Sequence, residues 1–218
     1  MIKKRLLTMA ILCAFTTSCI STSAFASTSG TISINKNSTS IKQEIKTYSQ
    51  YRDTLTNYVS VQADGTFALN APSNVKNTIP SSILKSIEDG MTATNSLIKS
   101  GELKANPNTK KAIKNSSKIV IDSVSGEDKV EFNWDHSEMD IYLNSKNAAR
   151  FAAKLGNEAI AVGVLTSIFG STLAGVLVGA AVGVNANEVS DANAEGNGVI
   201  LSYIMVDGGY ELLMISPQ

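Results

Sequence analysis

The sequence predicts an α+β protein: an N-terminal helical region with a small β-hairpin, then a C-terminal ββ-αα-ββ unit in which an apolar helical hairpin packs on a small antiparallel sheet. Three observations support this fold class. Apolar residues recur at helical spacing in the first half, and alternating runs flank turn dipeptides in the second half. Between those runs, residues 159–187 form a stretch of 29 residues without a charge.

The first 26 residues have the pattern of a signal peptide. A basic start (Lys3, Lys4 and Arg5) precedes an apolar run over residues 6–15, and small residues in Ala24-Phe25-Ala26 offer a cleavage site. The apolar run is shorter than the roughly 20 residues that span a bilayer. We therefore predict secretion with cleavage after Ala26, with a retained anchor as the alternative.

The positions of the cysteines and the distribution of charge limit the chemistry that the mature chain can perform. Cys13 and Cys19 both lie in the predicted leader, so a disulfide scaffold and thiol chemistry are excluded, although lipidation of Cys19 is a second alternative to cleavage. The chain from residue 155 onward has no Lys or Arg and six acidic residues. This distribution excludes a basic nucleic-acid surface there.

Residues 27–39 are rich in Ser, Thr, Asn and Gly, which predicts a mobile arm. Residues 40–58 then predict a helix that begins with a capping box at Ser40. Its apolar face is interpreted as core-facing, with a partner-binding face as the alternative. That face consists of Ile41, Ile45, Tyr48, Tyr51, Leu55 and Tyr58.

The rest of the N-terminal region (40–117) is predicted as a hairpin, a helix and a linker. Short alternating runs around Asp64-Gly65 predict the hairpin over residues 59–69. Apolar residues at helical spacing after Pro80 predict a helix that ends near Gly101. The Lys-rich segment 102–117 is expected to be an exposed linker, a protease-accessible joint or a short solvated helix.

The C-terminal domain (118–218) is predicted to contain the sheet. Alternating runs predict strands at residues 118–124, 129–134, 139–143, 199–206 and 210–215. Asp207-Gly208-Gly209 marks the last hairpin turn. Two hairpins therefore bracket the apolar segment, and the order of the strands stays open.

The apolar segment (146–187) is predicted to be a helical hairpin, with helices at about 146–169 and 172–186. Phe169-Gly170-Ser171-Thr172 is the expected break, and Asn144 or Ser145 is the expected first cap. Small residues stand four apart along it and form a glycine zipper that permits close helix packing or membrane association. This small-residue row consists of Ala159, Gly163, Ser167, Ser171, Gly175, Gly179 and Gly183.

Three interpretations of the apolar segment remain open: the buried core of a soluble domain, conditional insertion into a target membrane, and a resident anchor. An ordinary anchor after an export signal would leave Arg150 and Lys154 outside, against the positive-inside preference. If the row packs two helices, Gly179→Leu is expected to overpack the core.

Few residues carry catalytic chemistry. His136, the only histidine, stands among Asp135, Glu138 and Asp140 and is interpreted as a solvated turn residue rather than part of a triad or metal site. We assign no catalytic, cofactor-binding or metal-binding residue and expect no cofactor. Trp134, the only tryptophan, is predicted either to pack in the core or to serve as an interfacial anchor.

The region from Lys129 to Ser216, with Trp134, the Ala/Gly-rich stretch and Gly196-Asn197-Gly198-Val199-Ile200, resembles a loose group of exported Firmicute proteins, some of them bacteriocin-like. The resemblance implies a secreted, non-enzymatic, membrane-active antagonist whose partner is a target-cell membrane or a surface receptor; oligomerisation is compatible with it. It supplies no functional residues. The alternative function is a soluble extracellular binding or structural module with the hairpin as its core.

Overall fold

The computed structural model describes residues 38–115, 124–181, 183–206 and 209–218. The predicted signal peptide (1–26), both cysteines and nearly all of the predicted arm (27–39) lie outside the described residues. The predicted strand at 118–124 lies outside them as well, except for Val124. The described residues from 39 onward belong to one compact unit.

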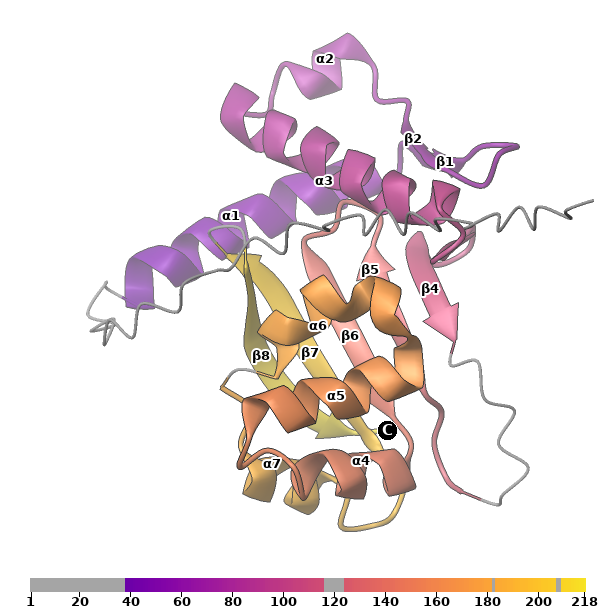
Figure 1. Cartoon of the computed structure of the whole chain (residues 1–218). Coiled ribbons are helices and arrows are strands. Elements are labelled where there is room, and N and C mark those ends of the chain that lie inside the picture. The colour runs from indigo at the N-terminus through magenta and orange to yellow at the C-terminus, as the bar shows by residue number, and fades with distance from the viewer. Residues whose placement is uncertain (1–37, 116–123, 182, 207–208) are drawn as a thin grey trace, which may run out of the picture. The chain divides into compact units, whose positions relative to one another are not determined.

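Six antiparallel strands form the main sheet, and they are arranged in the order in which they occur along the chain. Each strand is hydrogen-bonded to the next, and Figure 1 shows the strands from residue 111 onward side by side. The described residues also contain a two-stranded sheet and seven α-helices, so the α+β prediction is confirmed. The strands of the main sheet are β3 (Lys104–Asn106), β4 (Lys111–Asn115), β5 (Lys129–Asn133), β6 (Glu138–Leu143), β7 (Val199–Val206) and β8 (Gly209–Pro217).

The elements before the sheet follow the predicted order. Helix α1 (Ser38–Thr56) leads into the hairpin of β1 (Val59–Val61) and β2 (Phe67–Leu69). A short helix α2 (Ser73–Lys76) precedes α3 (Ser81–Lys99), which begins directly after Pro80 as expected. Leu55 of α1 is fully buried, and Tyr48 and Tyr51 pack against the core, so the core-facing interpretation is confirmed for these three members of the stripe.

The segment expected to be a Lys-rich linker (102–117) instead contains β3 and β4. Ala112 is fully buried, and Lys111 and Lys114 form ion pairs with acidic residues on neighbouring segments. These lysines therefore belong to a strand, with Lys111 on one face and Lys114 on the other, and acidic side chains pair with each of them. Because β4 pairs with β5, residues on both sides of the expected boundary at 117/118 share one sheet.

The connection between β6 and β7 is a series of short helices rather than a two-helix hairpin. The predicted helix 146–169 is divided, because Asn157 caps a new helix by accepting a hydrogen bond from the Ile160 amide. The break at Gly170 and the cap at Asn144 are confirmed. The elements are α4 (Ser145–Ala152), α5 (Glu158–Phe169), the 3-10 helix η1 (Ser171–Leu173), α6 (Ala174–Ala180) and α7 (Ala186–Ala192).

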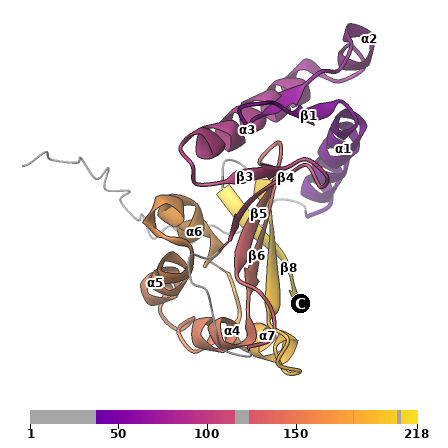
Figure 2. The same ribbon diagram turned by 90° about the vertical axis from the view of Figure 1, so that its right-hand side faces the viewer.

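Helices α4, α5 and α6 cover one face of the sheet, which Figure 2 shows edge-on. Large apolar side chains from both layers form the core between them, and the Tyr203 hydroxyl donates a hydrogen bond to the Ala180 carbonyl oxygen. Within the described residues, no helix is both long enough and apolar enough to cross a membrane. The core side chains include Phe132, Met139, Ile141, Leu143, Leu201 and Tyr203 from the sheet, and Phe151, Leu165, Phe169, Leu173 and Leu177 from the helices.

The Gly196-Asn197-Gly198-Val199 segment joins α7 to β7 at a point of close backbone contact. Gly198 has φ +90°, and a Cβ atom there would lie 2.5 Å from the Leu143 carbonyl oxygen. Only glycine fits both the positive φ and the contact. This segment, one of the three features on which the resemblance rests, therefore packs against the end of β6 in this chain.

Candidate functional site

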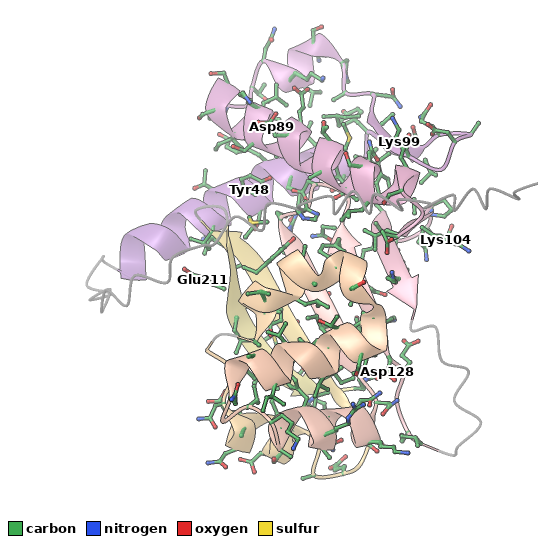
Figure 3. The ribbon with its side chains drawn as sticks, viewed as in Figure 1. Tyr48, Asp89, Lys99, Lys104, Asp128 and Glu211 are labelled. Carbon is green, nitrogen blue, oxygen red and sulfur yellow. The ribbon has the colours of Figure 1, made fainter. Side chains whose placement is uncertain are left out.

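A cavity of about 520 Å³ lies where α1 and α3 meet the β5–β6 turn and the end of β7. Helix α1 contributes Tyr48 and Arg52, and the turn contributes Asp135 and His136. Figure 3 labels Tyr48 on α1, at the opposite end of the sheet from Asp128. The volume falls in the range of roughly 300–1,000 Å³ typical of small-molecule sites.

Asp135 is the most unusual group in the cavity lining. Its side chain is nearly inaccessible, with 2% of the residue exposed. The Oδ1 atom accepts hydrogen bonds from the Ser137 hydroxyl at 2.9 Å and the Ser137 amide at 3.4 Å, whereas Oδ2 has no hydrogen-bond partner. Burial raises the pKa of this carboxyl above its ordinary value. A buried acceptor without a partner costs about 1–3 kcal/mol, so its presence requires an explanation.

The turn that carries Asp135 is held in place by a glycine in the middle of α3. A Cβ atom on Gly90 would lie 2.0 Å from the Asp135 carbonyl oxygen, so the helix backbone rests directly on the turn. His136 has φ +60°, and its amide donates to the Asn133 carbonyl oxygen at 2.9 Å. Helix α3 and the turn therefore form a tight junction that fixes the carboxylate.

His136 is packed between rings, so the prediction of a solvated turn residue is wrong. Its imidazole stacks on Phe132 with ring centroids 4.9 Å apart, and Tyr210 meets it edge-on at 5.8 Å. The Nδ1 atom lies 3.3 Å from the Thr94 hydroxyl oxygen. Burial lowers the pKa of His136 from 6.5 to about 4, which keeps the ring neutral at physiological pH. Helices packed over the turn exclude the solvent that the prediction assumed.

The acidic residues near His136 in sequence separate in space. Glu138 accepts a hydrogen bond from Arg52 Nη1, while Asp140 accepts one from Lys111 Nζ at 2.9 Å. Among the residues that the structure describes, no group of three or more His, Cys, Asp or Glu side chains is placed to hold a metal ion. The triad and metal alternatives for His136 therefore gain no geometric support.

Arg52 lines the cavity, but its guanidinium is already engaged. Nη1 pairs with Glu138, and Nε and Nη2 donate to Asp53 Oδ1 at 3.1 and 3.0 Å. Tyr48 lies close to Asp135: burial, the negative charge of Asp135 and a long hydrogen-bonding contact with its carboxylate all raise the pKa of the tyrosine hydroxyl. The Asp135 charge is consequently only partly offset by Arg52.

Trp134 is a core residue, so the interfacial-anchor alternative is wrong. It is 2% exposed, and its indole Nε1 donates a hydrogen bond to the Thr56 hydroxyl at 3.1 Å. Helix α1 passes over the end of β5 and covers the ring. A tryptophan whose single donor is satisfied inside the protein has no polar edge left to place at a membrane surface.

The small-residue row lies on the outer side of the helices rather than between them. Gly179 is half-buried and the other six members are exposed. A Cβ atom on Gly163, Gly175, Gly179 or Gly183 would have no neighbour within 4 Å, so Gly179→Leu is not expected to overpack the core. Large side chains such as Leu165 and Leu177 occupy the buried side instead, because their burial removes far more apolar area from water.

Sequence reasoning named Tyr48 and Asp135 in other roles, did not name Arg52, and did not predict that the three line one cavity. The cavity brings together segments more than 80 residues apart, as the Arg52–Glu138 pair shows. The one local signal was Gly90, a poor helix former in the middle of a clear helical pattern. No family model, curated protein or solved structure matches the chain.

Gly90→Ala tests the α3–turn junction. The new methyl group would meet the Asp135 carbonyl oxygen, so we expect the free energy of unfolding to fall by about 1–3 kcal/mol. The matched control is Gly163→Ala, a helical glycine with open space around it, which should gain about 0.5–1 kcal/mol from helix propensity. Urea denaturation measures both; equal effects at the two positions would contradict the junction.

His136→Asn tests the buried imidazole. The folded-state pKa of about 4 lies below the unfolded value of 6.5, so the unfolded state binds the extra proton first. The free energy of unfolding should therefore decrease as pH falls from about 6.5 to 4, by about 2–3 kcal/mol in total. Asparagine tolerates the positive φ and lacks the proton site. Denaturation at several pH values should show this loss in the wild type and not in His136→Asn; parallel curves would contradict the burial.

Proposed function

We propose that the chain is a secreted, non-enzymatic binding module that holds a small ligand in the cavity around Asp135. The observation that carries the proposal is the Asp135 Oδ2 atom, a buried acceptor without a hydrogen-bond partner on a residue that lines a cavity of about 520 Å³. Native proteins rarely bury such an atom, and those that do often use it in function. A ligand that donates a hydrogen bond would satisfy it.

The proposed location is extracellular, on the basis of the signal-peptide pattern and the cleavage site after Ala26. A mature chain without cysteine depends on packing for its stability. The single cluster that includes Leu55, Phe132 and Leu165 supports that dependence, since it joins the N-terminal helices, the sheet and the covering helices.

The position of the apolar segment favours a binding module over membrane insertion. Leu165, Phe169, Leu173 and Leu177 are each 0–1% exposed in the core against the sheet. Insertion into a bilayer would require these side chains to leave the sheet and expose its apolar face. Each of them contributes about 1.5–3 kcal/mol while buried, so the folded arrangement opposes insertion.

The proposal assigns no catalytic residue and no cofactor. His136 is stacked between Phe132 and Tyr210, which limits its approach to a substrate in the cavity. Nucleic acid is not the proposed ligand either, because residues 118–218 carry 13 acidic and five basic residues, a net charge of −8.

The exposed small-residue row favours a second candidate, the bacteriocin-like action that the family resemblance implies. Ile160 on α5 and Val178 on α6 are 49% and 53% exposed. Together with the row, they form an outer surface of α5 and α6 that has little charge and few large side chains. Such a surface suits contact with a target-cell membrane or a membrane-bound receptor.

Ala93→Phe tests the cavity as a binding site. Ala93 lines the cavity from α3, so a phenyl ring there should narrow it. Titration of the mature protein with 1-hexanol, followed by NMR, should give saturable shifts in the amides of residues 90–93 and 135–137. We expect Ala93→Phe to weaken this binding at least tenfold.

The matched control for that variant is Ser96→Phe, an exposed position on the same helix that does not line the cavity. It should bind 1-hexanol as the wild type does. The binding-site proposal fails if the wild type shows no saturable shifts, or if both variants lose binding equally.

Ile160→Glu and Val178→Glu test the membrane candidate. Carboxylates on this surface would oppose contact with lipid, so we expect dye release from liposomes and flotation of the protein to fall at least tenfold. Leu213→Glu is the control, since Leu213 on β8 is 61% exposed and lies outside α5 and α6. A wild type that neither floats nor releases dye between pH 4 and 8 would remove this candidate.

A further inference from the structure

Resting on the proposed binding site, we propose that the cavity selects ligands with a primary ammonium group, which docks on Asp135 Oδ2. The two carboxylate oxygens differ in a way that points to a donor. Ser137 donates two hydrogen bonds to Oδ1, while Oδ2 is buried with no donor within hydrogen-bond distance, and the Tyr48 hydroxyl reaches the carboxylate only at longer range. An ammonium group offers three donors and no acceptor, so it can satisfy Oδ2 without leaving a new unpaired acceptor.

The charges around the cavity favour a cation over an anion. Among the described residues of the lining, Arg52 carries a positive charge at neutral pH and already pairs with Glu138 and Asp53, whereas burial keeps His136 neutral. With Asp135, three carboxylates therefore face one guanidinium. Two other elements pack around the site. On β8, the Tyr210 hydroxyl donates a hydrogen bond to the His136 carbonyl oxygen. Helix α3 lines the cavity with the uncharged residues Ser86, Gly90 and Ala93. A ligand carboxylate would meet net negative charge.

The remaining lining suits the rest of such a ligand. Ile45, Ala93, Ile204, Met205 and Val206 provide an apolar wall for a carbon chain or ring. The hydroxyl groups of Tyr48 and Ser49 lie in the same lining and can accept further ammonium protons. The site therefore combines one charged contact with an apolar compartment, as small-molecule sites commonly do.

Binding of an ammonium group should be coupled to the release of a proton from Asp135, which can be measured. In the empty cavity, burial raises the pKa of Asp135, and the facing groups are Tyr48 and Arg52 from α1, His136 from the turn and Tyr210 from β8. A bound ammonium stabilises the carboxylate and lowers that pKa again. Binding should therefore release a proton and become tighter as pH rises through the raised pKa of Asp135. A neutral alcohol should show neither effect.

The experiment compares three six-carbon probes, hexylammonium, 1-hexanol and hexanoate, on the mature wild-type protein and on Asp135→Asn. NMR titration should show that the wild type binds hexylammonium at least tenfold more tightly than 1-hexanol and binds hexanoate least. Asp135→Asn should lose at least tenfold in hexylammonium affinity and change by less than about twofold for 1-hexanol, since a charged hydrogen bond contributes more than a neutral one.

Isothermal titration of the wild type in two buffers of different ionisation enthalpy keeps the test valid if Asp135→Asn does not fold. Release of a proton with hexylammonium, and none with 1-hexanol, supports the inference. Equal affinities for hexylammonium in the wild type and Asp135→Asn, or no proton release at any pH between 4 and 8, overturn it while leaving the cavity as a site for 1-hexanol. If no probe binds the wild type, the proposed function and this inference fail together.

Discussion

The burial of the β5–β6 turn beneath α1 and α3 is the contact on which the functional site depends. Gly90 allows the α3 backbone to rest on the Asp135 carbonyl oxygen, and Arg52 of α1 reaches Glu138 just beyond the turn. Because of this packing, the acidic turn that contains His136 is largely shielded from solvent and lines a cavity. The unusual states of Asp135 and His136 both follow from it, because the loss of water raises the pKa of a carboxyl and lowers that of an imidazole.

In the structure, the helices of the apolar segment cover one face of the sheet, and their inner and outer sides differ. Its large side chains, such as Leu165 and Leu177, face the strands and complete the core. Its small side chains face outward, where Gly163 and Gly179 have open space around them. A pattern that resembled a helix-packing motif therefore forms part of the outer surface, away from the cavity at the end of the sheet.

Local patterns predicted the elements well wherever one face was strongly apolar. Helix α3, strands β5 and β6, the break at Gly170 and the cap at Asn144 all matched, because capping and alternation act within a few residues. The errors arose where the pattern was mixed. Strand β4 was taken for a linker because Lys111 and Lys114 were counted as solvated, whereas acidic partners elsewhere in the fold pair with them.

The sequence by itself determined the fold class and most of the elements, while the leader and the cysteine-free mature chain stay predictions. These features depend on composition and on neighbours along the chain. Only the tertiary structure decided that Trp134 is a core residue, that the small-residue row faces outward, and that Asp135 is buried beside a cavity. Each of these depends on which distant segment packs over the residue, and hydrophobic burial, which drives that choice, has no directional signature in a short stretch of sequence.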